Sequence, residues 1–302
     1  MSKNLIGSID IGSNSTLLLV LNTKTKEVVE EVSTITALGR GLDKNGVFQD
    51  KSMEDTFRAL SEYKDKCKSI GCEKIIVTAT EASRVAKNAQ EFFSRVKREL
   101  GLEIQIISGE GEAYYTAFGI NEMMKSKSKV QLILDVGGAS SELILIKPKP
   151  FEILKTVSLP IGSVRVDDWI KDGELKKNLD AIFEKYNVED YSGYDVIGVA
   201  GTLTSLALMF SGANEFSNDA INNFSLALAD FNESVDRIQL VDAKALGKQF
   251  SFLGKRSKTI QSGAICSQTI LNKINPKEIK FSTYGLRYGT AISGAIDETY
   301  LV

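Results

Sequence analysis

The chain has 302 residues, 43% hydrophobic and 25% charged, and a formal net charge of −2. This length suits two domains of about 150 residues each, and the charge excludes an overall basic field that would gather nucleic acid or an anionic membrane. The absence of histidine excludes the usual serine-hydrolase triad, histidine zinc sites and phosphohistidine intermediates. Carboxylates, hydroxyls, Lys, Arg and backbone groups remain, and Mg²⁺ fits that inventory as a cofactor.

The N-terminal segment reaches Asp10 before a signal-peptide apolar core could form, and no apolar run approaches the roughly 18 residues of a membrane span. We therefore expect a cytoplasmic protein without a membrane partner. The cysteines, Cys67, Cys72 and Cys266, lack zinc-finger spacing, which indicates reduced structural thiols.

The first half of the chain alternates strand and helix patterns in the α/β manner. An apolar run, a Gly/Ser/Asn turn and a second apolar run over Ser8–Leu21 predict a β-hairpin. Further strands are predicted over Lys74–Thr78 and Glu103–Ile107, and helices over Met53–Ile70, Ala89–Gly101 and Glu110–Lys125.

The polar stretch Lys125–Lys129 is the predicted domain boundary, which gives domains over 1–125 and 126–302. A helix over about 287–302 can pack back on the first domain. The second half is predicted to hold strands near Gln131–Lys147 and Val196–Ala200, and helices near Leu203–Phe210, Asp242–Phe252 and Ser262–Ile274.

An internal repeat links the two halves. The segment Ser8–Leu21 aligns with Ile133–Ile146 at an offset of 125, and Asp10 falls on Asp135. The glycines and serines of the turns also align. This self-similarity predicts two duplicated α/β domains with equivalent hairpins.

The two repeated turns are candidate phosphate sites, because a Gly-rich turn aims consecutive N–H groups and hydroxyls at one anion. Asp10 and Asp135 precede the turns and can hold Mg²⁺, directly or through water. Ordinary hairpins with turn-forming aspartates are the alternative. The predicted phosphate ligands are Gly12, Ser13, Asn14, Ser15, Gly137, Gly138, Ala139 and Ser140.

A third loop, Val196–Ser205, runs from an apolar strand into a predicted helix, where free N–H groups and the helix dipole favour an anion. Gly201 and Thr202 are the predicted phosphate contacts. Simple strand-to-helix packing remains the alternative.

Seven segments in order resemble the Ppx/GppA family of exopolyphosphatases and guanosine pentaphosphate phosphohydrolases, within the actin, sugar kinase and Hsp70 superfamily. The resemblance covers essentially the whole chain. It implies two actin-like, ribonuclease H-like domains with an interdomain cleft. The matching segments are IDIGSNST at Ile9–Thr16, ATEASRVAKN at Ala79–Asn88, ISGEGEA at Ile107–Ala113, LDVGGASSE at Leu134–Glu142, LPIGSVR at Leu159–Arg165, VAGTLTSLA at Val199–Ala207 and STYGLRYG at Ser282–Gly289.

The resemblance also implies roles for individual residues. Glu112 matches the glutamate that activates the attacking water, and Glu142 matches a second catalytic carboxylate that places metal and water. Arg84 matches an arginine that contacts substrate phosphate. Gly111 departs from the glutamate common in the family, which leaves Glu110 as an alternative to Glu112. The histidine-aspartate-type domain of longer members is expected to be absent, since the chain has no histidine.

The function implied is Mg²⁺-dependent hydrolysis of the terminal phosphoanhydride of inorganic polyphosphate, of pppGpp, or of both. A sugar or carboxylate kinase of the same superfamily and a non-catalytic alarmone sensor are the alternatives.

The basic run Lys255, Arg256 and Lys258 is either a solvated face or a track for a long polyanion, and the second interpretation favours polyphosphate. A homodimer is one assembly state that the sequence allows.

Overall fold

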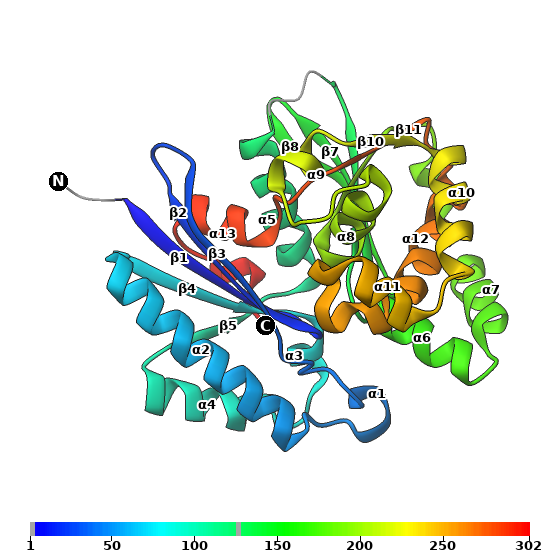
Figure 1. Ribbon diagram of the computed structural model, residues 1–302. Coiled ribbons are helices and arrows are strands. Elements are labelled where there is room, and N and C mark those ends of the chain that lie inside the picture. The colour runs from blue at the N-terminus through cyan, green and yellow to red at the C-terminus, as the bar shows by residue number, and fades with distance from the viewer. Residues whose placement is uncertain (1–3, 125–127) are drawn as a thin grey trace. The chain divides into compact units, whose positions relative to one another are not determined.

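The computed structural model describes residues 4–124 and 128–302 (Figure 1). Contacts between residues divide the chain into two compact units. Unit 1 holds the described residues up to 124 together with Tyr284–Val302, and unit 2 holds those from 128 to Thr283. The C-terminal segment from Tyr284 thus belongs to the N-terminal unit, whereas the sequence assigned it to the second domain with a helix returning to the first. Residues 125–127 of the predicted boundary lie outside the described residues.

Unit 1 is built on a five-stranded sheet with the order β3-β2-β1-β4-β5. The strands β1, β2 and β3 pair antiparallel, and β4 and β5 continue parallel to β1. The strands are β1 (Leu5–Ile11), β2 (Ser15–Asn22), β3 (Glu27–Ile35), β4 (Lys74–Ala79) and β5 (Ile104–Ile106). The helices are α1 (Leu42–Asn45), α2 (Asp50–Ile70), α3 (Glu81–Val85), α4 (Ala89–Leu100), α5 (Gly109–Met123), α13 (Leu286–Ser293) and the 3₁₀ helix η3 (Glu298–Tyr300).

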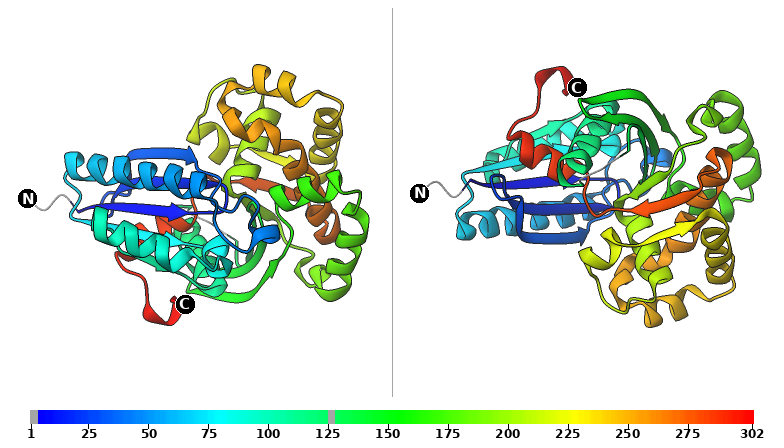
Figure 2. Two further views of the ribbon diagram at one scale, coloured as in Figure 1. Left: turned by 90° about the horizontal axis from the view of Figure 1, so that it is seen from below. Right: turned by 90° about the horizontal axis from the view of Figure 1, so that it is seen from above.

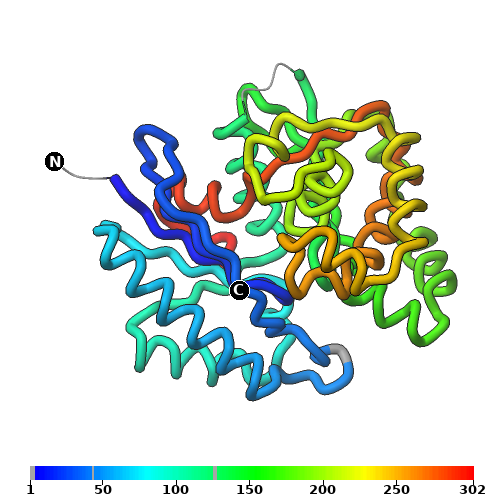
Figure 3. Tube along the Cα trace, in the orientation of Figure 1, coloured from blue at the N-terminus to red at the C-terminus, as the bar shows by residue number. Residues whose placement is uncertain are grey.

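Helices cover both faces of this sheet, as the two views of Figure 2 show, with α2 and α4 on one face and α5 and α13 on the other. The period-two alternation of β2 explains this arrangement. Leu18 and Val20 enter the core cluster that α2 and α4 complete, while Leu19 and Leu21 pack with Tyr288 of α13. Figure 3 shows the C-terminal segment running beside the N-terminal strands.

Unit 2 has a six-stranded sheet with the order β10-β11-β9-β6-β7-β8. Apart from the added β10, this order repeats that of unit 1, which confirms the predicted duplication and the actin-like fold class. The strands are β6 (Gln131–Val136), β7 (Ser141–Pro148), β8 (Phe151–Leu159), β9 (Val196–Val199), β10 (Ser225–Ala227) and β11 (Glu278–Phe281). The helices are α6 (Ser163–Lys171), α7 (Leu175–Lys185), η1 (Val188–Tyr191), α8 (Ala200–Ser211), α9 (Asn218–Asn222), α10 (Leu228–Gln239), α11 (Ala243–Gln249), η2 (Ser251–Lys258) and α12 (Ile260–Ile274).

One predicted helix is wrong in detail. Residues 242–252 do not form a continuous helix, because α11 ends at Gln249 and η2 begins at Ser251. Gly254 then has φ 50° and ψ −128°, a backbone conformation that no helix continues through.

In residues 4–124 and 128–302, no helix combines the length and the apolar character of a membrane span.

The helices α5 and α13 approach each other backbone to backbone. A Cβ atom on Gly289 would lie 1.9 Å from the carbonyl oxygen of Tyr115, and one on Gly119 would lie 2.4 Å from that of Gly285. Such contact is possible only without side chains at these positions. The glycines therefore fix how closely α13 packs on the helix that begins beside Glu112.

We predict that Gly289→Ala lowers the free energy of unfolding by about 2 kcal/mol or more, since the added methyl group has no space. The matched control is Gly109→Ala, because a Cβ on Gly109 meets nothing within 4 Å. Urea denaturation of both variants measures the difference. Equal midpoints for the two variants would contradict the close-packing account.

Candidate active site

The turn between β1 and β2 is held in one shape by the backbone around it. The N–H of Gly12 donates to the carbonyl of Ser15 at 3.0 Å. The carbonyl of Ser13 accepts from the N–H of Gly39 at 2.8 Å, and that of Asn14 accepts from Ala37 at 2.9 Å. These bonds occupy the turn's carbonyls, which would repel an anion, and pack the turn on the segment that follows β3.

Asp10 stands near the end of β1, just before this turn. Its Oδ1 atom is buried and has no hydrogen-bond partner in the described part of the chain. Burial first, and then the negative charge of Glu112, raises the pKa of Asp10 from 3.8 to about 7, while Arg287 opposes the rise. An unsatisfied buried carboxylate oxygen beside a second carboxylate is an environment that a cation would stabilise.

Arg287 belongs to the framework of unit 1. Its Nη1 donates to the carbonyl of Leu18 at 3.0 Å, and its Nη2 donates to Glu31 at 2.8 Å. Both charged side chains of this ion pair are largely buried. Arg287 therefore ties α13 to the strands β2 and β3, which is a structural role for the predicted segment STYGLRYG.

Arg84 and Glu112 form the charged centre of unit 1. The Nη1 and Nη2 atoms of Arg84 both lie 3.1 Å from Glu112 Oε2. Nη1 also donates to the carbonyl of Ile107 at 2.7 Å, and Nη2 donates to Glu81 at 2.9 Å. Burial raises the pKa of Glu112 above its usual range, and Arg84 opposes that rise. The structure thus gathers Asp10, Arg84 and Glu112 in unit 1.

The first turn of α5 separates the two glutamates that the sequence left as alternatives. Ser108 caps the helix, since its Oγ accepts from the N–H of Gly111 at 3.1 Å. Glu112 points to Arg84, whereas Glu110 is exposed to solvent. This geometry favours Glu112 as the functional residue.

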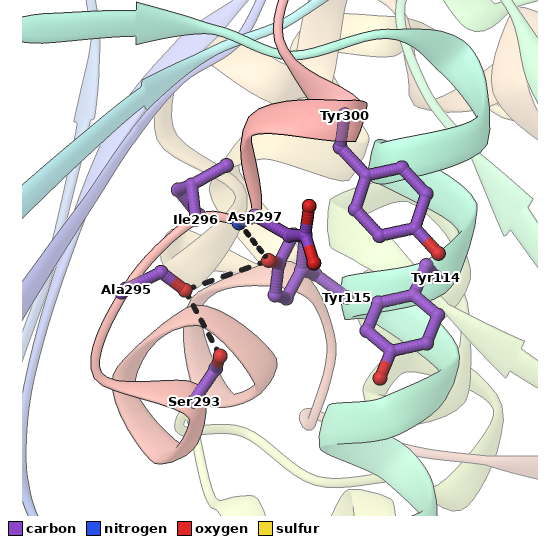
Figure 4. Close-up of a pocket in the computed structure, with 7 residues that line it drawn as sticks. All are labelled: Tyr114, Tyr115, Ser293, Ala295, Ile296, Asp297 and Tyr300. Atoms are coloured by element: carbon purple, nitrogen blue, oxygen red, sulfur yellow. Dashed lines mark hydrogen bonds between the residues drawn. The ribbon is translucent and has the colours of Figure 1, made fainter.

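Gly111 is explained by its neighbour Tyr300. A Cβ atom at residue 111 would lie 2.7 Å from the Cβ of Tyr300, so a glutamate there would displace η3. Tyr300 stacks on Tyr114 with ring centroids 5.0 Å apart. A pocket beside these rings has a volume of about 320 Å³. Figure 4 shows the residues that line it, which are Tyr114, Tyr115, Ser293, Ala295, Ile296, Asp297 and Tyr300.

The turn between β6 and β7 in unit 2 repeats the geometry of the first turn. The N–H of Gly137 donates to the carbonyl of Ser140 at 3.0 Å, as Gly12 does to Ser15. The carbonyl of Gly138 accepts from the N–H of Val164 at 2.9 Å, at the start of α6. A Cβ on Gly162 would lie 2.4 Å from Gly138, so the glycine of LPIGSVR allows the turn to pack on α6.

Asp135 and Glu142 are direct partners across the β6–β7 pair, so their side chains share one face of the sheet. Glu142 is only 4% exposed, and Ser158 on β8 donates to its Oε1 at 2.8 Å. In unit 1 the equivalent partner of Asp10 is Leu17. Of the two repeated hairpins, only that of unit 2 therefore has a second carboxylate, Glu142, opposite its aspartate.

The third predicted loop lies between β9 and α8 in unit 2. Ala200 has φ 65°, which is unusual for a residue with a side chain. Gly201 packs against the guanidinium of Arg256, and the buried side chain of Thr202 packs against Gly263. The predicted passage from strand to helix is present, whereas the positive φ of Ala200 was not predicted, and the side chain of Thr202, a predicted phosphate contact, is buried.

Two contacts of the site were missed from the sequence. Glu81 holds Arg84 from three residues away on α3, a helical spacing that could have been noticed. Ser158 holds Glu142 through strand pairing, for which one sequence gives no signal. Across residues 4–124 and 128–302, no group of three or more Cys, Asp or Glu side chains gathers as a metal cluster.

Comparison with known proteins adds the family context. A model of the "Ppx/GppA phosphatase family" matches residues 19–297. The guanosine-5'-triphosphate,3'-diphosphate pyrophosphatase of Vibrio parahaemolyticus is 30% identical over 68% of this chain, which spans 43% of that protein's length. Exopolyphosphatase 1 of Mycobacterium bovis is 25% identical over 94% of this chain and 86% of its own length. The crystal structure of the Aquifex aeolicus Ppx/GppA family member superposes with a TM-score of 0.80 at 26% identity, covering 96% of this chain and 97% of that one.

The raised pKa of Asp10 predicts a pH-dependent stability. The contribution of protonated Asp10 to the free energy of unfolding is fully present below pH 3.8. It is lost as the pH rises through about 7, the pKa of Asp10 in the folded protein. Since asparagine cannot ionise, the melting temperature of Asp10→Asn relative to wild type should increase between about pH 5 and about pH 8. Calorimetry in EDTA with exposed Asp65→Asn as the control measures this. A difference that does not change with pH would count against the environment described for Asp10.

Proposed function

Because the chain belongs to the Ppx/GppA phosphatase family, we propose that it hydrolyses the terminal phosphoanhydride bond of inorganic polyphosphate or pppGpp, with Glu112 as the general base. The names of the relatives support this proposal, since one is an exopolyphosphatase and the other acts on guanosine-5'-triphosphate,3'-diphosphate. The observation that supports Glu112 as the base is that Arg84 contacts only one of its two carboxylate oxygens.

Both guanidinium contacts end on Oε2 of Glu112. The other oxygen, Oε1, has no hydrogen-bond partner among the described residues, and the side chain is 17% exposed. A water molecule can therefore donate to Oε1 while Arg84 fixes the carboxylate through Oε2. Because burial raises the pKa of Glu112, its ionised carboxylate is a stronger proton acceptor than that of an exposed glutamate.

In the proposed reaction Glu112 takes a proton from this water as the water oxygen attacks the terminal phosphorus. The bond from that phosphorus to the bridging oxygen breaks, and orthophosphate and the shortened chain leave. N–H groups of the Gly-rich turn of unit 1 bind phosphate oxygens, and Arg84 can do so by exchanging Glu81 for the substrate.

Mg²⁺ is part of this proposal. Asp10 in unit 1 fits a cation, because its buried Oδ1 lacks a partner in the described chain. In unit 2, Asp135 is the counterpart of Asp10, and its strand partner Glu142 adds a second carboxylate. When bound, Mg²⁺ would neutralise charge on the phosphoryl oxygens. A magnesium titration of the melting temperature that is identical for wild type and Asp10→Asn would refute the role of Asp10.

Inorganic polyphosphate is the substrate that we propose to be preferred over pppGpp. Lys255 and Lys258 are exposed on η2, where they can contact a long polyanion without reading a base. Comparison of kcat/KM for polyphosphate and pppGpp tests the preference, and a higher value for pppGpp would reverse it.

We predict that Glu112→Gln loses about a hundredfold or more in kcat, since the amide cannot accept the proton. The matched control is Glu110→Gln, which changes an exposed glutamate on the same helical turn and should retain nearly full activity. Release of orthophosphate from tripolyphosphate measures both. A severe loss in the control with a mild loss in Glu112→Gln would assign the base to Glu110.

A further inference from the structure

The pocket of unit 1 lies where α5 meets the segment from the end of α13 to η3. All of its lining residues belong to unit 1, and its volume of about 320 Å³ is at the lower end of the range for small-molecule sites. Figure 4 shows that α5 contributes Tyr114 and Tyr115, while the other lining residues come from the C-terminal segment. Neither Glu112 nor any predicted phosphate ligand lines it, so the proposed hydrolysis leaves this pocket unexplained.

Hydrogen bonds hold the C-terminal side of the pocket in place. The Tyr115 hydroxyl accepts from the N–H of Asp297 at 2.8 Å and donates to the carbonyl of Ala295 at 3.4 Å. The Oγ atom of Ser293 donates to the same carbonyl at 2.9 Å. The pocket is therefore formed before a ligand binds, which lowers the entropic cost of binding.

Tyrosine rings form the apolar part of the pocket. Tyr114 and Tyr300 stack with their ring centroids 5.0 Å apart and their planes inclined by 27°. The ring of Tyr115 is nearly perpendicular to both, with centroid distances of 5.2 Å and 5.8 Å. The face of a tyrosine ring attracts a cation, and its area packs against an aromatic or alkyl group.

Asp297 gives the pocket a negative charge. Its Oδ1 accepts from the N–H and the Oγ1 of Thr299 at 2.9 Å and 2.8 Å, and these bonds lower the pKa of Asp297, so it is ionised at neutral pH. Its Oδ2 accepts no hydrogen bond within the described residues. In Figure 4 the side chain lies beside the rings of Tyr115 and Tyr300.

No cation of the described chain neutralises this carboxylate. No Lys or Arg is among the lining residues, and the charge of a basic residue is not among the causes that lower the pKa of Asp297. Lys74 reaches the same segment, but its Nζ donates to the carbonyl of Gly294 at 2.8 Å. Burial raises the pKa of Tyr300, and the charges of Asp297 and Glu110 add to that rise. This negative environment disfavours a phosphate chain and favours a cation.

We propose that this pocket binds a small organic amine, with the ammonium group on Oδ2 of Asp297 and the aromatic or alkyl body against the tyrosine rings. The one lining carboxylate matches one ammonium group, so a monoamine fits better than a polyamine. The proposal is independent of the proposed function, because it concerns a different ligand at residues that take no part in the hydrolysis.

The test is binding of phenethylammonium to the full chain, measured by isothermal titration calorimetry at neutral pH. Hydrocinnamate is the matched ligand, since it carries a carboxylate on a similar aromatic body, and it should bind at least about tenfold more weakly. Asp297→Asn should weaken binding of the amine by about tenfold or more, because it removes the charge. Asparagine can still cap η3 as Asp297 does.

The matched control is Glu298→Gln, which removes an exposed charge that does not line the pocket and should change the affinity by less than about twofold. Tyr114→Leu should weaken binding by about threefold or more, since leucine has no ring face. Melting temperatures check folding, and if Tyr114→Leu is unfolded, Asp297→Asn decides.

Three results would overturn the site. The first is the absence of saturable binding of phenethylammonium up to about 10 mM. The second is an affinity for hydrocinnamate equal to that for the amine. The third is wild-type affinity in a folded Tyr114→Leu variant, or a loss in Asp297→Asn no larger than that in Glu298→Gln.

Discussion

The ion pair between Arg84 and Glu112 is the contact on which the site of unit 1 depends. A general base must be held in place, yet a carboxylate fully paired with arginine would be too weak to take a proton. As the proposed base, Glu112 would meet both needs, because the two guanidinium nitrogens of Arg84 contact a single one of its carboxylate oxygens. The Ile107 carbonyl and Glu81 hold the guanidinium itself, so the pair does not rely on one bond.

The framework that holds this pair is built from close backbone approaches. Gly111 admits Tyr300 at the start of α5, and Gly119 and Gly289 bring α13 onto the same helix. In unit 2, Gly162 lets the β6–β7 turn rest on α6, and Gly201 admits Arg256. At Gly119, Gly162 and Gly289 glycine is required because a Cβ would collide with neighbouring backbone, not because a turn needs positive φ.

Much of the fold was predictable because the duplicated hairpins leave a periodic signal that repeats at a fixed offset. Both hairpins and the duplication follow from that signal, while the α/β alternation came from the apolar patterns and the actin-like class was implied by the family resemblance. The third strand of each sheet was not predicted, since β3 and β8 are partly exposed and less apolar than their neighbours. The break between α11 and η2 depends on one glycine conformation, which the helical pattern of residues 242–252 conceals.

The residues of the candidate site were predictable where they lie close together in the sequence. Asp10, Gly12 and their counterparts in unit 2 stand in short motifs that one sequence displays. The partners that orient the charged groups lie elsewhere in the chain: Ser158 reaches Glu142 only through the pairing of β7 and β8. The inward turn of Arg256 likewise depends on packing between η2 and α8. Such long-range contacts are properties of the folded chain.

Hydrolysis of tripolyphosphate in ¹⁸O-labelled water with Mg²⁺ and no acceptor, followed by ³¹P NMR, tests the proposed reaction most directly. Attack of a water held by Glu112 on the terminal phosphorus should place one ¹⁸O atom in the released orthophosphate and leave the pyrophosphate unlabelled. Label in the pyrophosphate, or phosphate transfer only after an acceptor alcohol or carboxylate is added, would contradict it.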